Sequence, residues 1–307
     1  PTTYGPIKAF AFGVKYSFAI TEQAYIYRAG NNGAGQLGLN DTTNRTTWTT
    51  DTARLISISG GSSHTLGISS SESKIYAAGI GSNYALGTGT TSNQNDFVLS
   101  ESGAMASGAT AKWVCAGRRQ SFAIRSDDAL VFVGENAQGL KGDGTTTGDS
   151  GSFVTIWTVI ASSNFDSKTP RAVYLTGQEN TREGAMMITT EGKIYGTGNN
   201  DRGQLGVGDT TDKTTWTAAT GGIASQTVTR LAFAGRVTFA LDSTGKVWSC
   251  GVAADTGQGL GSADADLTTF TKITIPAEFY SKTIVNIVGQ ARGIYAVDSE
   301  GTLWGTG

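Results

Sequence analysis

Short apolar segments that end in glycine recur along the whole chain. Two apolar segments precede each of them, and large and small side chains alternate, as in Leu231–Ala234, which favours β-strands over helices. The glycine-terminated segments, expected to be third strands, span residues 24–30, 74–79, 129–134, 193–198, 246–251 and 302–307. Six such copies indicate a protein built by repeating one supersecondary unit.

A glycine-rich segment follows five of these third strands. It reads Asn-Asn-Gly-Ala-Gly-Gln-Leu-Gly at 31–38 and Asn-Asn-Asp-Arg-Gly-Gln-Leu-Gly at 199–206, with degenerate versions at 83–87, 137–142 and 257–261. Gly and Asn adopt positive φ readily, so these segments are typical of compact turns. We expect the Leu of each turn to be buried against the neighbouring sheet.

A fourth strand is expected after these turns, at motifs that combine Thr with aromatic residues (46–48, 153–157, 214–216 and 268–270). Four strands per repeat are typical of a β-propeller blade. We therefore predict an all-β fold, a single β-propeller domain of six four-stranded blades over residues 1–307. The approximate repeats are 8–53, 54–110, 111–170, 171–229, 230–283 and 284–307, the last completed by residues 1–7.

The two ends of the chain complement each other in this pattern. Residues 2–7 have the fourth-strand signature without a preceding blade, and the last repeat stops at Gly307 before its fourth strand. We predict that the N-terminal strand joins the last blade and closes the ring, which removes sheet edges that promote aggregation. The Trp and Tyr side chains of the third strands are expected to fill the spaces between blades.

The repeat also resembles a known family. A Trp or Tyr strand ending in Gly, followed by Asn-Asn-x-x-Gly-Gln-Leu-Gly, is similar to the repeat of the regulator-of-chromosome-condensation family, whose members form β-propellers. The resemblance covers essentially the whole chain and is strongest in copies one and four. Family members usually have seven blades, so the resemblance implies either a smaller ring or one blade outside this sequence.

The known functions of this family depend on features that can be looked for in the repeats of this chain. The founding member is a nucleotide-exchange factor for a small GTPase and docks on nucleosomes, whereas this chain lacks a basic N-terminal arm. The family's ultraviolet-B photoreceptor uses a Gly-Trp-Arg-His-Thr repeat, whereas the equivalent segments here, 61–65 and 117–121, contain no Trp. The resemblance therefore implies protein binding more than exchange activity or photoreception.

Composition excludes several function classes. The net charge is −2, with 43 Gly and 4 Pro, so a concentrated basic surface for nucleic acid is not expected. No apolar run approaches the roughly 18 residues that span a bilayer, so membrane insertion is not expected either. The start at Pro1 is neither a signal peptide nor an initiating Met, and we expect processing or cloning to have produced it.

The sequence predicts no enzyme, cofactor or metal site. The single histidine, His64, is a poor basis for a catalytic triad, and Tyr16 and Gln120 replace it in other copies, so we interpret it as a core residue. No phosphate-binding loop, nucleophile elbow or Cys/His cluster is present. Cys115 and Cys250 fall in different repeats and are interpreted as small core residues.

Acidic pairs offer no better catalytic candidate. Asp127 with Asp128, and Asp264 with Asp266, fall in predicted turns, where solvated carboxylates are common. Calcium binding would need further oxygen ligands, and glycosidic acid–base chemistry would need a spatially matched carboxylate partner. The sequence shows neither.

Cations recur in the turn between the first and second strands. By propeller symmetry these turns would gather on one face around the axis, where a ring of cations could bind a carboxylate, phosphate or sulfate group. The alternative is that they are solvated loop charges. The candidate residues are Lys15, Arg118, Arg119, Arg182, Arg236 and Arg292.

The sequence favours a non-enzymatic recognition or adhesion module. The main hypothesis is a phage or microbial surface protein, similar to a virion fibre or phage tail component, that binds a host glycan or another structural subunit. Flanking domains and a virion or extracellular location go with it. The alternative is a cytoplasmic protein-binding regulator of the nucleotide-exchange type, and a polysaccharide enzyme is a third, weaker class.

Overall fold

The computed structural model describes residues 5–176, 183–252, 259, 265–274, 276–289 and 293–306. These residues form five antiparallel sheets, which confirms the all-β class. The first sheet contains β1 (Ile7–Phe12), β2 (Tyr16–Thr21), β3 (Tyr25–Gly30), β4 (Arg45–Gly60), β5 (His64–Ser69), β6 (Ile75–Gly79) and β7 (Gln94–Leu99).

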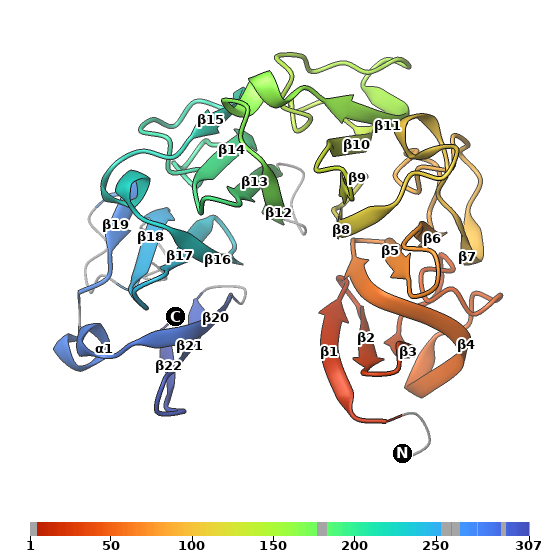
Figure 1. The fold of residues 1–307 in the computed structure, drawn as a ribbon, viewed down its shortest axis with the longest axis horizontal. Coiled ribbons are helices and arrows are strands. Elements are labelled where there is room, and N and C mark those ends of the chain that lie inside the picture. Colours follow the sequence, from red (N-terminus) through yellow and green to blue (C-terminus); the bar gives the residue numbers. More distant parts are fainter. Residues whose placement is uncertain are drawn as a thin grey trace. The chain divides into compact units, whose positions relative to one another are not determined.

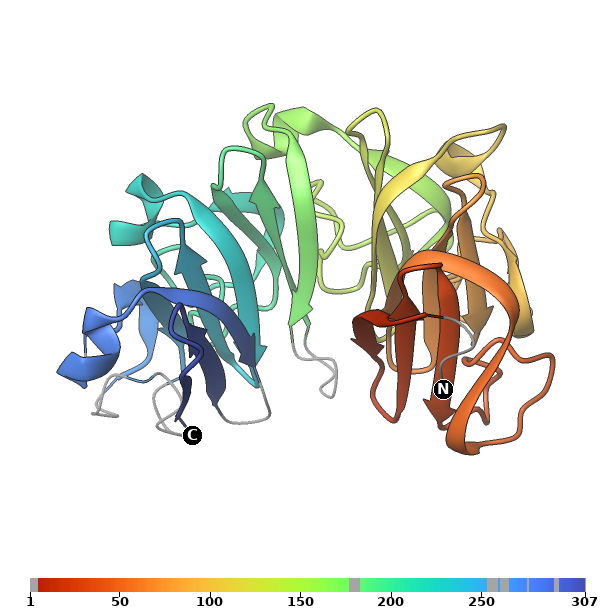
Figure 2. The same cartoon turned by 60° about the horizontal axis from the view of Figure 1, so that its bottom comes forward.

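Three further sheets have four strands and the last has three. The strands of the last sheet are drawn in blue in Figure 2. The four-stranded sheets are β8 (Ala111–Ala116), β9 (Gln120–Arg125), β10 (Leu130–Glu135) and β11 (Phe153–Ile160); β12 (Pro170–Thr176), β13 (Gly184–Thr189), β14 (Ile194–Gly198) and β15 (Lys213–Ala218); β16 (Val228–Ala234), β17 (Val237–Asp242), β18 (Val247–Gly251) and β19 (Leu267–Lys272). The last sheet is β20 (Ile284–Gly289), β21 (Ile294–Asp298) and β22 (Leu303–Thr306). The helical segments are η2 (Gly103–Met105), η3 (Ser162–Phe165), η4 (Gly222–Ser225) and α1 (Ala277–Ser281).

The long strand β4 joins two repeats within the first sheet. Its N-terminal part pairs with β3, from Arg45 opposite Gly30, and its C-terminal part pairs with β5 from Leu55 onward. The orange ribbon in Figure 1 follows this strand from one group to the next. The described strands therefore form six consecutive groups, which we call blades one to six, and blade six has three strands.

The chain divides into two compact units. One contains the residues up to Ala137 together with Thr145–Ala161, and the other contains Gln138–Gly144 together with the residues from Ser162 onward. The glycine-rich loop of blade three is thus part of the second unit. Closure of a single ring stays a prediction: residues 2–4 of the expected closing strand lie outside the described residues, and Ile7 pairs with Thr21 in blade one.

Aromatic side chains fix the glycine-rich loops. On the fourth strand of the next blade, one ring packs so closely on the last glycine of the loop that a Cβ there would lie 2.0 to 2.5 Å from it. Glycine is therefore required by space as well as by its positive φ. The four contacts are Gly38 with Phe97, Gly87 with Trp157, Gly142 with Trp216, and Gly206 with Phe270.

Trp48 holds the same fourth-strand position in blade one but lies in a different environment. Its side chain is 49% exposed, whereas Trp157, Trp216 and Phe270 are at most 4% exposed. It lines an apolar cavity of about 680 Å³ together with Phe10 and neighbouring residues of blade one. Blade one therefore has the aromatic residue of this contact, but no glycine-rich loop among the described residues covers it.

Buried hydroxyl groups add a second contact between successive blades. The second residue of β5, β9 and β17 donates to a loop carbonyl of the preceding blade: Thr65 to Gln36, Ser121 to Ala85 and Thr238 to Gln204, at 2.7 to 2.8 Å. Blade four has Ala185 at this position, and Thr197, directly opposite Ala185 on β14, donates to Gly139 O at 2.9 Å instead. The hydroxyl has moved to the neighbouring strand, but its partner is still a loop carbonyl of the preceding blade.

The sequence patterns locate most of these elements. The third strands β3, β6, β10, β14, β18 and β22 begin within one residue of the expected positions. Leu37, Leu86, Leu140 and Leu205 of the loops are at most 3% exposed, as expected, and Leu260 lies outside the described residues. The sequence pattern did not reveal β7, because its residues 94–99 lack the Thr-rich motif of the other fourth strands.

The cysteines and the third-strand aromatics behave as interpreted. Cys115 and Cys250 are buried thiols, and burial raises the pKa of Cys250 well above its usual range. Tyr195 and Trp248 of the third strands are buried as well, and Trp248 packs in the cluster that contains Met186 of the preceding blade. Trp248 thus contributes to the packing between adjacent blades.

Candidate functional site

A backbone hydrogen bond defines which turn residues are equivalent. In five blades the residue before the second strand accepts, through its carbonyl, the N–H that follows the third-strand glycine, at 2.9 to 3.2 Å. These five accepting residues are Lys15, Ser63, Arg119, Glu183 and Arg236. The candidate cations Lys15, Arg119 and Arg236 therefore occupy one structural position.

The same bond shows what differs in blade four. Glu183 occupies the position of the cations there and is 4% exposed, while its backbone N–H donates to Gln138 Oε1 at 2.7 Å. Arg182 and, in blade six, Arg292 lie outside the described residues. A complete ring of cations stays a prediction. The spacing of the cations along the sequence did not indicate that an acidic residue occupies the equivalent position in blade four.

The first three turns adjoin one another in the first unit. Val14 donates its N–H to Gly61 O at 3.2 Å, and Ser62 donates to Gly117 O at 3.0 Å. The approach is so close that a Cβ on Gly61 would lie 2.1 Å from Gly117 O. The turn of blade two, which carries no cation, is therefore held directly against the turn that carries Arg118 and Arg119.

A polar pocket of about 290 Å³ lies at this contact. Arg118 and Arg119 line it from blade three, and the turn and glycine-rich loop of blade two provide the rest of the wall. Hydroxyl and amide groups predominate among the latter, which are Ser62, Ser63, Ser82 and Asn83, with His64, Ile80 and Ala85. The turn of blade two contains none of the candidate cations, but together with the loop it supplies the neutral hydrogen-bonding part of the pocket.

Carboxylates moderate the positive charge of the turns. Arg119 Nη1 lies 3.4 Å from Glu135 Oε1, and Arg236 Nη1 lies 3.3 Å from Asp201 Oδ2. All four side chains are partly exposed, so these pairs contribute little to folding stability. The pair at Arg119 is also long for a charge-assisted hydrogen bond, which leaves room for a better-placed partner. Lys15 is exposed.

His64 is a structural residue at the base of the pocket. It is 2% exposed, and its Nε2 lies 2.9 Å from Ser121 Oγ, whose proton is donated to Ala85 O. His64 therefore donates from Nε2, and burial lowers the pKa of its imidazole from 6.5 to about 4. It is neutral at physiological pH and joins blade two to blade three, as the core interpretation required.

The acidic pairs fall in ion pairs at the surface. Asp127 lies 2.7 Å from Arg125, Asp128 pairs with Lys112, and Asp266 lies 3.3 Å from Arg202, while Asp264 is outside the described residues. Among the residues that the structure describes, no three His, Cys, Asp or Glu side chains gather as metal ligands. In the same part of the chain, no helix is long and apolar enough to cross a membrane.

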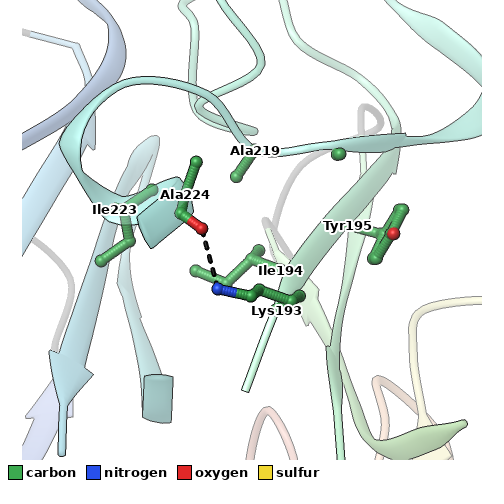
Figure 3. A pocket seen from close by; sticks show the side chains of 7 residues that line it. Lys193, Ile194, Tyr195, Ala219, Ile223 and Ala224 are labelled. Atoms are coloured by element: carbon green, nitrogen blue, oxygen red, sulfur yellow. Dashed lines mark hydrogen bonds between the residues drawn. The ribbon is translucent and has the colours of Figure 1, made fainter. Parts of the chain in front are cut away.

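A second, smaller pocket in the second unit has a structural explanation. It holds about 140 Å³ between β14 and η4 (Figure 3). Lys193 Nζ donates to Ala224 O at 2.9 Å and to Gln226 O at 3.2 Å, and the Tyr195 hydroxyl donates to Asp166 at 2.8 Å. Lys193 thus holds η4 on the sheet, and the Tyr195 hydroxyl contacts the residue that follows η3.

Comparison with known proteins supports the fold. No protein-family model matches the chain. The chain is 26% identical to the ultraviolet-B receptor UVR8 of Arabidopsis thaliana over 211 residues, which is 67% of this chain and 44% of that protein. It therefore spans less than half the length of this curated relative.

Solved structures give the same result over more of the chain. Human WBSCR16 matches with a TM-score of 0.75 at 16% identity, covering 95% of this chain and 72% of that one. Prp20p of Saccharomyces cerevisiae, described with its binding properties to Gsp1p and histones, matches with a TM-score of 0.67 at 17% identity, covering 95% and 82%. The expected resemblance is confirmed, and at these identities the structural matches show the fold alone.

Proposed function

Because the chain is a β-propeller of the regulator-of-chromosome-condensation type, we infer that it is a non-enzymatic module that recognises another protein. The observation that carries this proposal is the polar pocket at which the turns of blades two and three adjoin in the first unit. The turns present guanidinium and hydroxyl groups on it, and the glycine-rich loop of blade two adds a hydroxyl and an amide. Such groups recognise a partner through hydrogen bonds and charge, and a rigid fold holds them in place at little entropic cost.

The comparisons favour this reading over the adhesive one. Prp20p is described with its binding to Gsp1p and histones, and a structure of Kap60 bound to yeast RCC1 also matches, at a TM-score of 0.64. Neither description names a glycan or a virion. We therefore place protein binding before the phage or microbial surface hypothesis, and the cytoplasm before the virion surface.

Parallel arrays test this choice. The labelled chain, applied to a protein array and to a glycan array at physiological salt, is expected to bind a restricted set of proteins saturably and to be displaced by unlabelled chain. Binding to glycans without any protein would restore the adhesion hypothesis. Binding on neither array would contradict both recognition functions.

We also propose that the six blades close into one ring. The proposal is supported by the repetition of the same aromatic and hydroxyl contacts between successive blades. Removal of residues 1–4 tests it: if the N-terminal strand completes blade six, the shortened chain is expected to unfold at a lower urea concentration. An unchanged unfolding midpoint would contradict closure through this strand.

A further inference from the structure

Blade one carries both side chains of a blade contact, the ring and the hydroxyl, without the loop that they hold in other blades. The strand pairing fixes the equivalence of the rings, since Trp48 and Phe97 each lie three residues after the partner of the third-strand glycine. Ser17 is the second residue of β2, as Thr65 is of β5. Trp48 is 49% exposed, and no described residue accepts a hydrogen bond from the half-buried Ser17 hydroxyl.

The glycine-rich loops that the structure describes are already engaged elsewhere. Four of them pack against a ring of the following blade, and they end in Gly38, Gly87, Gly142 and Gly206. Gly259 of the fifth loop belongs with blade six, because a Cβ on it would lie 3.8 Å from Thr306 Cγ2. Closure of the ring as proposed above would not fill the site, since the fourth strand of blade six would then come from residues 2–4 and no loop would lead to it from β22.

The apolar cavity beside Trp48 extends this site. Its volume of about 680 Å³ is in the range of ligand sites, and none of the described residues that line it is charged. Phe10 lines the cavity at the position that Ile58 has in blade two, and Ile58 packs in one cluster with Leu37 of the preceding loop. Blade one therefore has an apolar surface for the leucine of a loop as well as a ring for its glycine.

We propose that this face of blade one binds a glycine-rich turn of the type Gly-Gln-Leu-Gly that a second polypeptide supplies. Trp48 packs on the last glycine of the turn, where a Cβ has no room, and the leucine packs on Phe10. The Ser17 hydroxyl donates to the carbonyl of the residue before the leucine, as Thr65 and Thr238 do at Gln36 and Gln204. This surface is separate from the polar pocket between blades two and three, so the inference goes beyond the recognition function proposed above.

Residues 30–45 of the chain provide a probe that organises its own turn. Asn32 Oδ1 accepts the N–H of Leu37 at 2.8 Å, and Asn32 Nδ2 donates to Asp41 O at 2.9 Å. The two ends, Gly30 and Arg45, lie opposite each other in the strand pairing, so an amide bond between them gives a cyclic peptide. Its one Asp and one Arg leave it without net charge, which excludes general charge attraction.

Fluorescence anisotropy of the labelled cyclic peptide, titrated with the intact chain, tests the proposal. We expect saturable binding that Trp48→Ala weakens by about tenfold or more, the loss typical of a central aromatic contact. Trp48→Phe is expected to retain binding, because Phe97 and Phe270 make this contact in other blades. Ser17→Ala, which removes one hydrogen bond, is expected to weaken binding by about two- to tenfold. Thermal unfolding checks that each variant folds.

Matched changes in the peptide test the same contact without altering the protein. Gly38→Ala is expected to abolish binding, because a Cβ at this glycine lies 2.5 Å from the ring in the blade contact that the structure shows. Gly33→Ala is the control: a Cβ there meets only Asn31 Oδ1, at 3.5 Å, so binding is expected to persist. Leu37→Ala is expected to weaken binding by about tenfold, since it removes the apolar contact with Phe10.

Three outcomes would overturn the inference. Absence of saturable binding, or equal binding of the Gly38→Ala and Gly33→Ala peptides, would show that blade one does not recognise the turn. An equal loss with Tyr280→Ala, which removes an aromatic side chain 39% exposed in blade six, would indicate non-specific apolar adsorption. Self-association of the intact chain that Trp48→Ala abolishes, without peptide binding, would assign the face to a second copy. None of these results depends on the protein array, so the proposed function stands or fails separately.

Discussion

Two neighbouring blade contacts in the first unit use chemically different side chains. Between blades two and three, Trp157 is 1% exposed, packs on Gly87, and donates its indole N–H to Ser100 at 2.8 Å. Between blades one and two, Phe97 takes the aromatic position on Gly38, and the fully buried guanidinium of Arg28 donates to Leu37 O at 3.0 Å. The glycine-rich loop is thus stabilised in blade two by a large aromatic ring and in blade one by a buried guanidinium group.

The difference teaches how far a blade contact tolerates substitution. Phe97 is smaller than Trp157 and cannot donate a hydrogen bond, and the guanidinium of Arg28 lies over its ring, 5.4 Å from the centroid. Arg28 also donates to Gly38 O and to Asp51. Its Nε has no hydrogen-bond partner among the described residues, so the charged solution satisfies its polar atoms less completely than the aromatic one.

Removal of the ring gives the largest expected effect. Trp157→Ala is expected to lower the free energy of unfolding by about 3 to 5 kcal/mol, because it leaves a large cavity and removes the indole donor to Ser100 Oγ, which itself donates to Leu86 O. Trp48→Ala is the matched control at the same fourth-strand position; half of that side chain is exposed, so a loss of about 1 kcal/mol is expected. Urea unfolding measures both. Equal losses would show that Trp48 is as covered as Trp157.

Removal of the charge comes next. Arg28→Ala is expected to cost about 3 kcal/mol, because it leaves the carbonyls of Leu37 and Gly38 without their donor. Arg28→Met retains the stem and its packing on Phe97, so it is expected to cost less than Arg28→Ala. Urea unfolding of the two variants measures the difference. A greater loss with Met than with Ala would contradict a role for the stem.

Acid should weaken the contact between blades two and three through His64. The folded protein protonates His64 only near pH 4, whereas the unfolded chain does so near its ordinary value of 6.5. The unfolded state therefore binds more protons between these values, and stability falls as the pH falls from about 6.5 to 4, by at most on the order of 3 kcal/mol.

His64→Gln isolates that contribution, since Gln120 holds the equivalent position in blade three. Urea unfolding of both proteins across this pH range measures it. The variant is expected to lose less stability than the parent on acidification, although carboxylates titrate in both. Parallel pH profiles would show that His64 is not the responsible group.

The displaced hydroxyl of blade four gives the smallest expected change. Thr197→Val is expected to cost about 1 kcal/mol, because it removes the donor to Gly139 O. Adding Ala185→Ser places the hydroxyl where the other blades have it and is expected to recover part of the loss. Urea unfolding of the single and double variants measures these changes in the free energy of unfolding. A further loss of stability in the double variant would show that β13 has no room for the hydroxyl.

The sequence predicts what repetition displays. The third strands and the buried loop leucines recur at fixed places, so their positions could be predicted closely, and His64 could be interpreted from its replacements in other copies. Arg28, by contrast, has no counterpart in the other third strands. The equivalent positions in blades two and four, judged from the strand pairing, are occupied by Ala77 and Gly196. A solution that occurs once cannot be found from a repeated pattern.

The candidate site illustrates the same limit. Sequence spacing identified the cationic turns, but the pocket depends on which neighbouring blade faces each turn, and the serines of blade two became relevant only through that contact. Glu183 also needed the backbone register, because it shares a position with Arg119 only when their carbonyl hydrogen bonds are compared. Three-dimensional neighbours therefore decide which repeated charges form a site.

The contacts at the glycine-rich loops run in one direction along the chain. There the later blade supplies the ring and the hydroxyl, and the earlier blade supplies the glycine and the loop carbonyl. A gene that duplicates or deletes one whole repeat consequently leaves a donor edge beside an acceptor edge, as links in a chain remain compatible when one is added or removed. Evolution can vary the size of such a protein in whole blades without inventing a new joint.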